Sequence, residues 1–408
     1  MKNKSAFLLS LAVIGPGLVV MFADTDAGSV ILAAQSGAIW GYKLLALQFI
    51  LMPILFIAQE LTVRLGLVTQ KGHGELIREK FGKAWAWFSI STLLVSCVGA
   101  IISEFSGMAG VGMMVGVPPW ITMILVIGFL ITIAWTGSYL AIERIAICLG
   151  AFELIFLVVA WMAHPSMQEI KEGLVNIPYQ NTDFLYLTAG NIGAVIMPWM
   201  IFYQQSAVVD KKLNIKHLRA ARIDTAIGAV ITQLVVAAVL ITTAATIGKT
   251  NPNMPLNTVH QITDALTPFL GSTAGKLFFA MGMMGASLVA AIVVSLTAAW
   301  SLGEVTGYKR SLEHKVHEAP WFYSIYTLSL IAGGAIVASG VINLVNLSVG
   351  VEVMNAMLLP IVLGFLFLLA RKALPQEFKL SGKYACFVGV VLGVTAVFGL
   401  MGGILGIL

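Results

Sequence analysis

The first long apolar run of the chain, residues 6–38, is interrupted by the polar stretch Asp24-Thr25-Asp26-Ala27-Gly28-Ser29. A later run, residues 185–207, contains Gly190-Asn191-Ile192-Gly193-Ala194-Val195-Ile196-Met197-Pro198-Trp199. In a bilayer an interrupted helix is tolerated only where it lines a cavity or binds a ligand, because backbone groups there have no water to pair with. The ring of Pro198 removes a helical hydrogen bond and frees carbonyls about one turn earlier, near Ala194. Both runs are therefore predicted to be discontinuous helices.

Composition places these stretches in a membrane. The 408 residues include 24 Lys and Arg and 19 Asp and Glu, or 11% charged, against 59% hydrophobic. A soluble domain carries about a quarter charged residues. This excludes a cytosolic enzyme, a nucleic-acid binder and a disordered chain, and the net charge of +5 lies in short clusters between apolar runs. The chain is expected to be an all-α integral membrane protein.

Eleven apolar runs are each long enough to cross a bilayer as a helix. They cover residues 6–38, 42–66, 84–112, 118–138, 142–163, 185–207, 220–248, 275–303, 321–340, 344–370 and 384–408. The two interrupted runs open successive blocks of five, which predicts an inverted repeat. The first repeat then spans residues 1–163, the second 185–370, and an extra span 384–408.

The basic residues predict the orientation. With the N-terminus in the cytoplasm, all but Lys43, Lys171, Lys249 and Lys276 of the 24 Lys and Arg residues fall on the cytoplasmic side. That bias matches the positive-inside rule and puts the C-terminus outside. Size and the lack of targeting signals suggest a bacterial inner membrane. Nothing resembles a nucleotide-binding loop, so no ATP is expected, and no oligomer is required.

Acidic residues within the apolar runs indicate the substrate. An ionised side chain at mid-bilayer costs at least ~2.5–3.5 kcal/mol, and no basic residue lies deep in a span to offset it. Such carboxyls are either protonated or hold a cation; Asp24 and Asp26, beside Ser29 and freed carbonyls, suit a hard or borderline divalent cation. The candidates are Asp24, Asp26, Glu60, Glu104, Glu153, Asp224, Glu304 and Glu352. Glu153 is interpreted as a protonated core acid and Glu352 as part of a permeation path, whereas the six histidines are placed in loops.

The two interrupted stretches resemble those of the Nramp family of divalent-metal transporters, and the resemblance runs over essentially the whole chain. The family's Asp-Pro-Gly-Asn falls on residues 26–29, and its Ala-x-x-Met-Pro-His falls on residues 194–199. The resemblance implies a LeuT-type fold of five plus five helices with discontinuous helices 1 and 6 and one extra helix. It also implies a metal site made by the Asp26 carboxylate, Ser29, the Ala194 carbonyl and the Met197 thioether, with Asp24 as an added carboxylate.

Departures from the family pattern bear on the ion and on its coupling. Trp199 and Gln204 replace two family histidines, and of an acidic pair only Glu104 is present. Glu352 replaces a glutamine, with Asn355 nearby, and Ala27 and Ser29 are smaller than their counterparts. The permeation path or the surroundings of the metal are assigned to Gly28, Glu104, Trp199, Gln204, Glu352 and Asn355. The wider, acidic site favours a partly hydrated Mg²⁺ without proton coupling, as in the Nramp-related magnesium transporters.

Two other functions remain open. A proton-coupled Mn²⁺ or Fe²⁺ transporter would use Met197 as a ligand, because a thioether favours softer ions. A sodium-coupled carrier of organic solutes would need a free helix N-terminus for a substrate carboxylate, which Asp24 and Asp26 would repel. An enzyme is not expected, because the spans contain no His-Glu-x-x-His or Ser/Lys constellation. The predicted partners are the transported divalent cation, with no other cofactor, and the lipid bilayer, with no nucleic acid.

Overall fold

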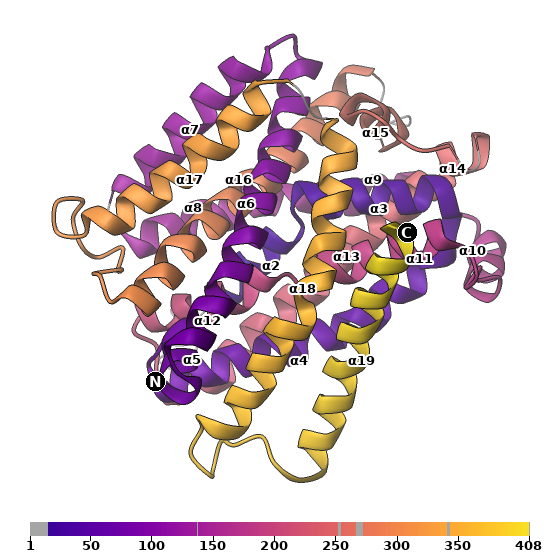
Figure 1. The fold of residues 1–408 in the computed structure, drawn as a ribbon. Helices are drawn as coiled ribbons and strands as arrows, with labels where there is room; N and C mark the ends of the chain where they lie inside the picture. Colours follow the sequence, from indigo (N-terminus) through magenta and orange to yellow (C-terminus); the bar gives the residue numbers. More distant parts are fainter. Residues whose placement is uncertain (1–14, 137, 252–253, 267–271, 341–342, 408) are drawn as a thin grey trace, which may run out of the picture.

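The computed structural model describes residues 15–136, 138–251, 254–266, 272–340 and 343–407, and this part of the chain contains helices and no strand (Figure 1). The start of the first apolar run, before residue 15, lies outside the described residues. The α-helices are α2 (Pro16–Asp24), α3 (Ala27–Trp40), α4 (Leu45–Thr69), α5 (His73–Phe81), α6 (Lys83–Met114), α7 (Pro119–Trp135), α8 (Tyr139–Gly150), α9 (Ile155–Met162), α10 (Met167–Val175), α11 (Thr182–Val195), α12 (Pro198–Asp210), α13 (Leu218–Ala245), α14 (Ile247–Thr250), α15 (Val259–Leu266), α16 (Ser272–Thr306), α17 (Pro320–Ala338), α18 (Leu344–Lys372) and α19 (Gly382–Ile407). Three 3₁₀ turns join them: η1 (Gly41–Leu44), η2 (Ala151–Leu154) and η3 (Ile215–His217).

Nine helical stretches of the described chain are long and apolar enough to cross a membrane, and α7 is a shorter apolar helix of 17 residues. The nine differ from the eleven predicted runs at two places. One is α7, and the other is the junction of the first two runs, because α3, η1 and α4 form one helical stretch of 43 residues. The chain bends at the start of η1, where Gly41 has φ 58, a conformation that glycine adopts without steric cost.

Both predicted interruptions are present. Helix α2 ends at Asp24, and Asp26 has an extended backbone (φ −71, ψ 178) before α3 begins. Helix α11 ends at Val195, and Met197 is likewise extended (φ −82, ψ 142) before Pro198 opens α12. Proline has no N–H to donate to the carbonyl four residues earlier, which is that of Ala194.

The packing places these interruptions between two apolar cores. The first core includes Val19–Ala23 of α2 and most of the apolar side chains of α12. The second includes Ala27 and residues 30–34 of α3, with Leu187 and Ala194 of α11. Helix α13 packs along α2, α3 and α4, and α11 packs on α18 and α19, which lie side by side in Figure 1. The interrupted segments thus form a thin polar layer inside an apolar protein.

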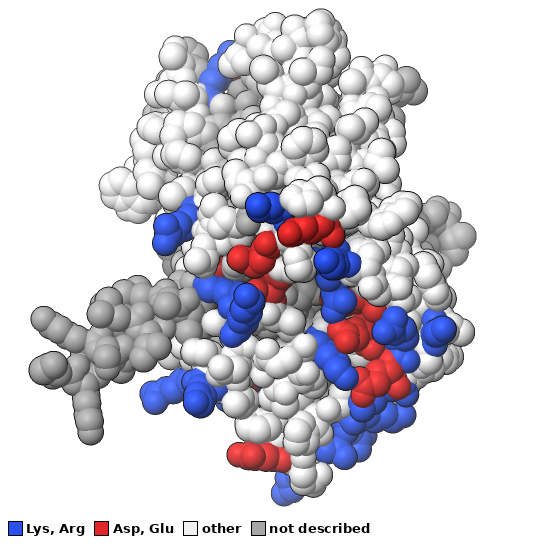
Figure 2. Space-filling model, turned by 90° about the vertical axis from the view of Figure 1, so that its left-hand side faces the viewer, with Lys and Arg blue, Asp and Glu red and all other residues white. Residues whose placement is uncertain are grey.

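Charge is distributed unevenly over the surface. On the face shown in Figure 2, the basic and acidic residues gather in the lower half, while the upper half is almost free of charge. Such one-sided clustering is typical of a chain whose loops differ in charge between the two sides of a membrane.

Candidate metal centre

Ser29 joins the two interrupted helices. Its Oγ donates to the carbonyl of Asp24 at 2.8 Å and lies 3.2 Å from the carbonyl of Ala194, both in hydrogen-bonding geometry. The carbonyl that Pro198 leaves without a helical partner is therefore directed at the break in the other helix. The structure brings together Asp26, Ser29, Ala194 and Asp24, as the sequence predicts for a site between the two breaks.

Each of the two aspartates keeps one carboxylate oxygen without a partner. Asp26 is the N-cap of α3: its Oδ1 accepts from the backbone N–H of Ser29 at 2.7 Å, while its Oδ2 has no hydrogen bond. Oδ2 of Asp24 accepts from the hydroxyl of Thr232 at 3.4 Å, while its Oδ1 has none. Both side chains are almost fully buried. Buried carboxylate oxygens without donors are costly, and a bound cation offsets that cost.

Two glutamates from other helices face the first break. Oε2 of Glu104, on α6, accepts from the N–H of Ala27 at 3.1 Å, and its Oε1 has no partner. Oε1 of Glu352, on α18, lies against the backbone of Gly28, so that a Cβ atom there would overlap it. Its Oε2 accepts from Nδ2 of Asn355 at 3.1 Å. Glu104, Glu352, Asn355 and Gly28 therefore lie where the sequence predicts the surroundings of the site.

Four buried carboxyl groups gather at the site, and no ion pair within the described part of the chain joins any of them to a basic residue. Asp24, Asp26, Glu104 and Glu352 are each at most 1% exposed. In the described part of the chain, the buried ion pairs are elsewhere: Glu60 binds Arg64 and Arg222, and Glu143 binds Lys211. Isolated carboxylates in a low-dielectric interior need a cation or a proton to offset their charge.

The carboxylates do not form a closed metal cage. Within the described residues, no three His, Cys, Asp or Glu side chains converge in a group that could hold a metal ion. A cation between the breaks would instead draw its ligands from one or two carboxylates together with the Ser29 hydroxyl, the Ala194 carbonyl and water. Mg²⁺ is usually bound in this manner, through a few protein oxygens and several retained waters.

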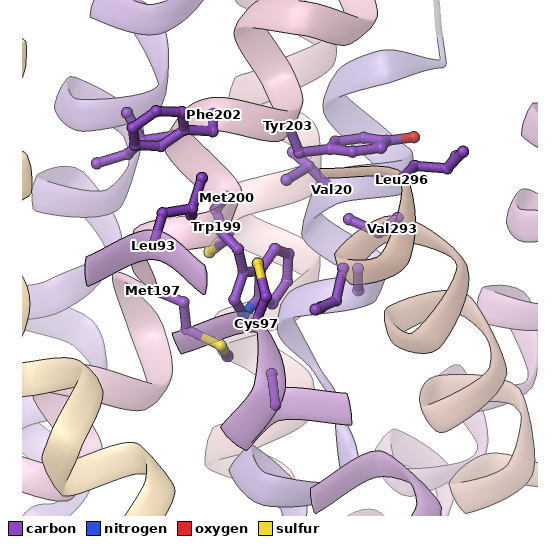
Figure 3. Packing of buried hydrophobic residues seen from close by; sticks show 14 of the residues in the cluster. Val20, Leu93, Cys97, Met197, Trp199, Met200, Phe202, Tyr203, Val293 and Leu296 are labelled. Atoms are coloured by element: carbon purple, nitrogen blue, oxygen red, sulfur yellow. The ribbon is translucent and has the colours of Figure 1, made fainter. Parts of the chain in front are cut away.

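Met197 and Trp199 lie in apolar surroundings. Figure 3 shows the two side chains near Leu93, Cys97 and Met200, and all five belong to the first apolar core. Both side chains are fully buried, and the indole Nε1 of Trp199 has no hydrogen-bond partner. Met197 thus stands at the second break with its side chain among apolar groups.

Gln204 belongs to a separate polar network. Its Nε2 donates to the hydroxyl of Thr225 at 2.7 Å, and its Oε1 lies 3.5 Å from Oγ1 of Thr62. It stands more than one turn along α12 from the break. The structure therefore separates Gln204 from the carboxylates, unlike Gly28, Glu104, Glu352 and Asn355.

Three polar residues near the first break were not among the predicted site residues: Ser103, Glu153 and Thr232. Oγ of Ser103 lies close to Gly28, and Glu153 is fully buried with neither carboxylate oxygen paired. Glu153 was interpreted from the sequence as a core acid. In the sequence, each of the three is recognisable only as a polar residue within an apolar run. That pattern is ambiguous, because Ser and Thr in such runs commonly bond to the backbone of their own helix.

Hydrogen bonds close the protein on both sides of the polar layer. At the start of α2, the N–H groups of Gly15 and Gly17 donate to Oδ2 of Asp224 at 3.2 and 2.8 Å. Beyond the breaks, Asn191 of α11 donates to the hydroxyl of Ser36 on α3 at 2.9 Å and accepts from Gln48 at 2.6 Å. These bonds tie the start of α2 to α13, and tie α11 to α3 and α4.

The sequence of this chain is similar to those of known membrane transporters. Residues 17–404 match the family described as "Natural resistance-associated macrophage protein-like" (Nramp). Among curated proteins, the divalent metal cation transporter MntH of Klebsiella pneumoniae strain 342 is 28% identical over 338 residues, which are 80% of this chain and 78% of that protein. MntH of Aeromonas hydrophila is 27% identical over 309 residues, 72% of each chain.

Solved structures share the fold. A manganese transporter of Eremococcus coleocola superposes with a TM-score of 0.76 at 20% identity, covering 98% of this chain and 86% of that one. MhsT in complex with L-phenylalanine superposes with a TM-score of 0.64 at 11% identity, covering 96% of this chain and 98% of that one. Both have the LeuT-type arrangement of helices, so the fold is of that type.

Proposed function

The chain belongs to the Nramp family, whose members are transporters and not enzymes, and from that premise we propose that it imports a divalent metal cation by alternating access. The observation that carries the proposal is the set of buried carboxyl groups at the break of the first helix, which have no basic partner among the residues that the structure describes. Beside them lie a hydroxyl and a freed carbonyl, and carboxylate and carbonyl oxygens bind a cation but repel an anion.

We propose eleven membrane crossings in two inverted repeats. In this count α2 and α3 are the two halves of the first crossing, and α4 is the second, although α3, η1 and α4 are continuously helical. The 17 residues of α7 reach the lower end of the roughly 17–25 that a crossing needs. The repeats comprise residues 1–163 and 185–370, with α19 as the extra crossing, the N-terminus in the cytoplasm and the C-terminus outside. A bacterial inner membrane fits the MntH relatives.

The polar layer lies between two apolar cores, and opening the protein on one side of this layer at a time would give alternating access. Release of Asn191 from Ser36 would open the outer side, and release of Asp224 from Gly15 and Gly17 would open the inner side. A membrane potential that is negative inside favours entry of a divalent cation by roughly 4–5 kcal/mol per 100 mV, twice the value for a single charge. Import without a coupled proton is therefore energetically feasible.

Within the divalent cations we propose Mg²⁺, bound with part of its water shell and without proton coupling. The side chains at residues 27 and 29 are small, and the ligands of the proposed site are oxygens. The thioether of Met197 packs with Leu93 and Cys97 in an apolar core (Figure 3), so the proposed site does not depend on sulfur. Hard ions such as Mg²⁺ prefer an oxygen site of this kind.

A proton-coupled Mn²⁺ or Fe²⁺ transporter is the second candidate. Met197 stands at the break in the second helix, and the fold is shared with a protein described as a manganese transporter. A sodium-coupled solute carrier has less support. The N–H groups of Ala27 and Ser29, at the start of α3, already donate to Glu104 and Asp26, so these two donors are not free for a substrate carboxylate.

One reconstitution separates these functions. The purified chain is placed in liposomes that contain a pH-sensitive dye, and uptake of Mg²⁺ and of Mn²⁺ is measured with and without a membrane potential. The proposal expects saturable Mg²⁺ uptake at millimolar concentration, stimulated by a negative interior and without acidification. Mn²⁺ uptake with acidification and without Mg²⁺ uptake would instead establish the proton-coupled alternative. Absence of uptake of any divalent cation would refute the proposed function.

A further inference from the structure

Glu153 is a buried acid that the site described above does not use. It lies in η2, the 3₁₀ turn between α8 and α9, and is fully buried. Among the described residues, neither of its carboxylate oxygens has a hydrogen-bond partner in normal geometry, although the side chain of Thr25 lies close enough to interact with it. Burial of such a group as a carboxylate without a partner costs several kcal/mol, and a bound cation would offset that cost.

The groups around Glu153 supply further oxygens. Its side chain lies beside Thr25, in the break between α2 and α3. The hydroxyl of Thr25 is 2.5 Å from that of Thr232 on α13, and the Thr232 hydroxyl donates to Oδ2 of Asp24 at 3.4 Å. Oδ1 of Asp24 has no partner. Two carboxylates from different helices and two hydroxyls therefore border one region at the depth of the break.

The packing of the backbone brings these groups together. Gly228 of α13 packs against Met21, and Gly150 of α8 packs against Phe22, because a Cβ atom on either glycine would meet those side chains at 2.6 and 2.4 Å, inside normal contact. Thr232 lies one turn further along α13, and Glu153 lies in η2, just after α8 ends at Gly150. The C-terminal end of α2 also lies here, and the carbonyls of its last turn form the negative end of the helix dipole.

We propose that Glu153, Asp24, Thr25 and Thr232 form a second binding position for a divalent cation, beside the position made by Asp26, Ser29 and Ala194. The inference rests on the proposed function. The donors are all hard oxygens, and two carboxylates balance the charge of one divalent ion. Asp24 lies next to both positions, so an ion moves from one to the other by exchanging ligands while Asp24 stays bound.

Equilibrium binding of Mn²⁺ to the purified full-length protein tests this inference. The wild type is expected to bind two Mn²⁺ per chain at saturation, and Glu153→Gln, which keeps the shape and removes the charge, is expected to bind one. Thr232→Val alters another residue of the proposed second site, and it is expected to weaken the binding of the second ion at least about tenfold. Glu304→Gln is the matched control and should bind two, because Glu304 is equally buried but is bonded to Gly74 and Ser206.

Electron paramagnetic resonance gives an independent readout. Two neighbouring Mn²⁺ ions broaden each other's lines, and Glu153→Gln should restore the narrow spectrum of an isolated ion. Saturation of the wild type at one Mn²⁺, or two ions retained in Glu153→Gln, would overturn the inference. If the wild type binds one ion and still transports divalent cations in liposomes, only the second position is wrong. If it transports none, the proposed function itself fails.

Discussion

The carboxylate of Glu352 rests directly on the backbone of Gly28, between α18 and the first turn of α3. A Cβ atom at residue 28 would overlap Oε1 of Glu352 and would lie 3.2 Å from Oγ of Ser103. Glycine is therefore needed at residue 28 because another helix brings an acid against it. This contact couples the position of Glu352 to the break that holds Asp26.

Gly28→Ala is expected to reduce divalent-cation uptake strongly. The methyl group would push Glu352 away from the break, and its new position would no longer match the remaining ligands. A displacement of about 1 Å in a binding site can cost on the order of 100-fold in rate. The measurement is initial uptake of Mg²⁺ and Mn²⁺ in liposomes at matched protein content.

Gly364→Ala is the control for this substitution. Gly364 lies on the same helix as Glu352, and nothing lies within 4 Å of a Cβ placed on it. The variant should transport like the wild type. Wild-type uptake by Gly28→Ala would mean that the position of Glu352 does not matter for transport.

Asp26→Asn separates the two roles of Asp26. As an N-cap, asparagine is about as good as aspartate, whereas alanine costs about 0.5–2 kcal/mol. The asparagine variant is therefore expected to keep the thermal stability of the wild type. Uptake should fall at least about tenfold, because the site loses a charged ligand. Asp26→Ala should lose both stability and uptake, and full activity of Asp26→Asn would assign Asp26 to capping alone.

The sequence was sufficient to locate the two breaks. Proline at residue 198 and two aspartates in an apolar run are local features, and each has a direct physical consequence for a helix. Asp26, Ser29 and Ala194 therefore lie together as predicted. The positions of the glutamates against α3 were harder to predict from the sequence. The hydrogen bond from Ala27 to Glu104 depends on how α6 packs, and no local sequence pattern determines that packing.

The location of His73 was predicted wrongly from the sequence. The map of apolar runs places His73 in a loop, but the structure buries it completely at the start of α5. The reason is tertiary: Glu304 of α16 accepts from the N–H of Gly74 at 2.8 Å and holds this turn against the helices. Thr232 and Glu153 were missed as site residues for a related reason, because their partners lie on helices that are distant in sequence.

Met197→Leu tests whether sulfur binds the transported ion. Leucine is also apolar and close in volume, so packing against Leu93 and Cys97 should be retained at a cost below about 1.5 kcal/mol. Under the proposed function, Mg²⁺ uptake should stay within about twofold of the wild type. Competition by Cd²⁺, a soft ion, should weaken if the thioether can reach it. Loss of Mg²⁺ uptake in a stable Met197→Leu protein would contradict the oxygen-only site.

His73 predicts a dependence of stability on pH. Its Nδ1 donates to Oε1 of Gln205 at 2.9 Å, since the amide nitrogen of Gln205 donates to the carbonyl of Lys71, and its Nε2 has no partner. Burial lowers the pKa of His73 from 6.5 to about 4, although the bond to Gln205 opposes the shift. Below pH 6.5 the histidine is protonated in the unfolded chain but not in the folded protein. The free energy of unfolding therefore decreases as the pH is lowered from 6.5 to about 4, by roughly 3 kcal/mol in all.

His73→Gln should flatten this dependence. The measurement is the melting temperature of the detergent-solubilised protein between pH 4 and 8, and the difference between the variant's and the wild type's melting temperatures should change over that interval. His317→Gln, at an exposed position, is the control and should follow the wild type. If the pH profile of His73→Gln were parallel to that of the wild type, the pKa of His73 would not be shifted by burial.

Asp224→Ala is expected to favour opening of the inner side. The variant loses two hydrogen bonds from Gly15 and Gly17 to a carboxylate, each about 1.5–3 kcal/mol in a buried position. The closed state should lose population by at least about tenfold. A single cysteine at residue 21 of α2, in a background without the three native cysteines, reports this as faster labelling by a cytoplasmic thiol reagent. Asp264→Ala, at an exposed position of α15, is the control, and unchanged labelling in Asp224→Ala would show that Asp224 does not hold the inner side closed.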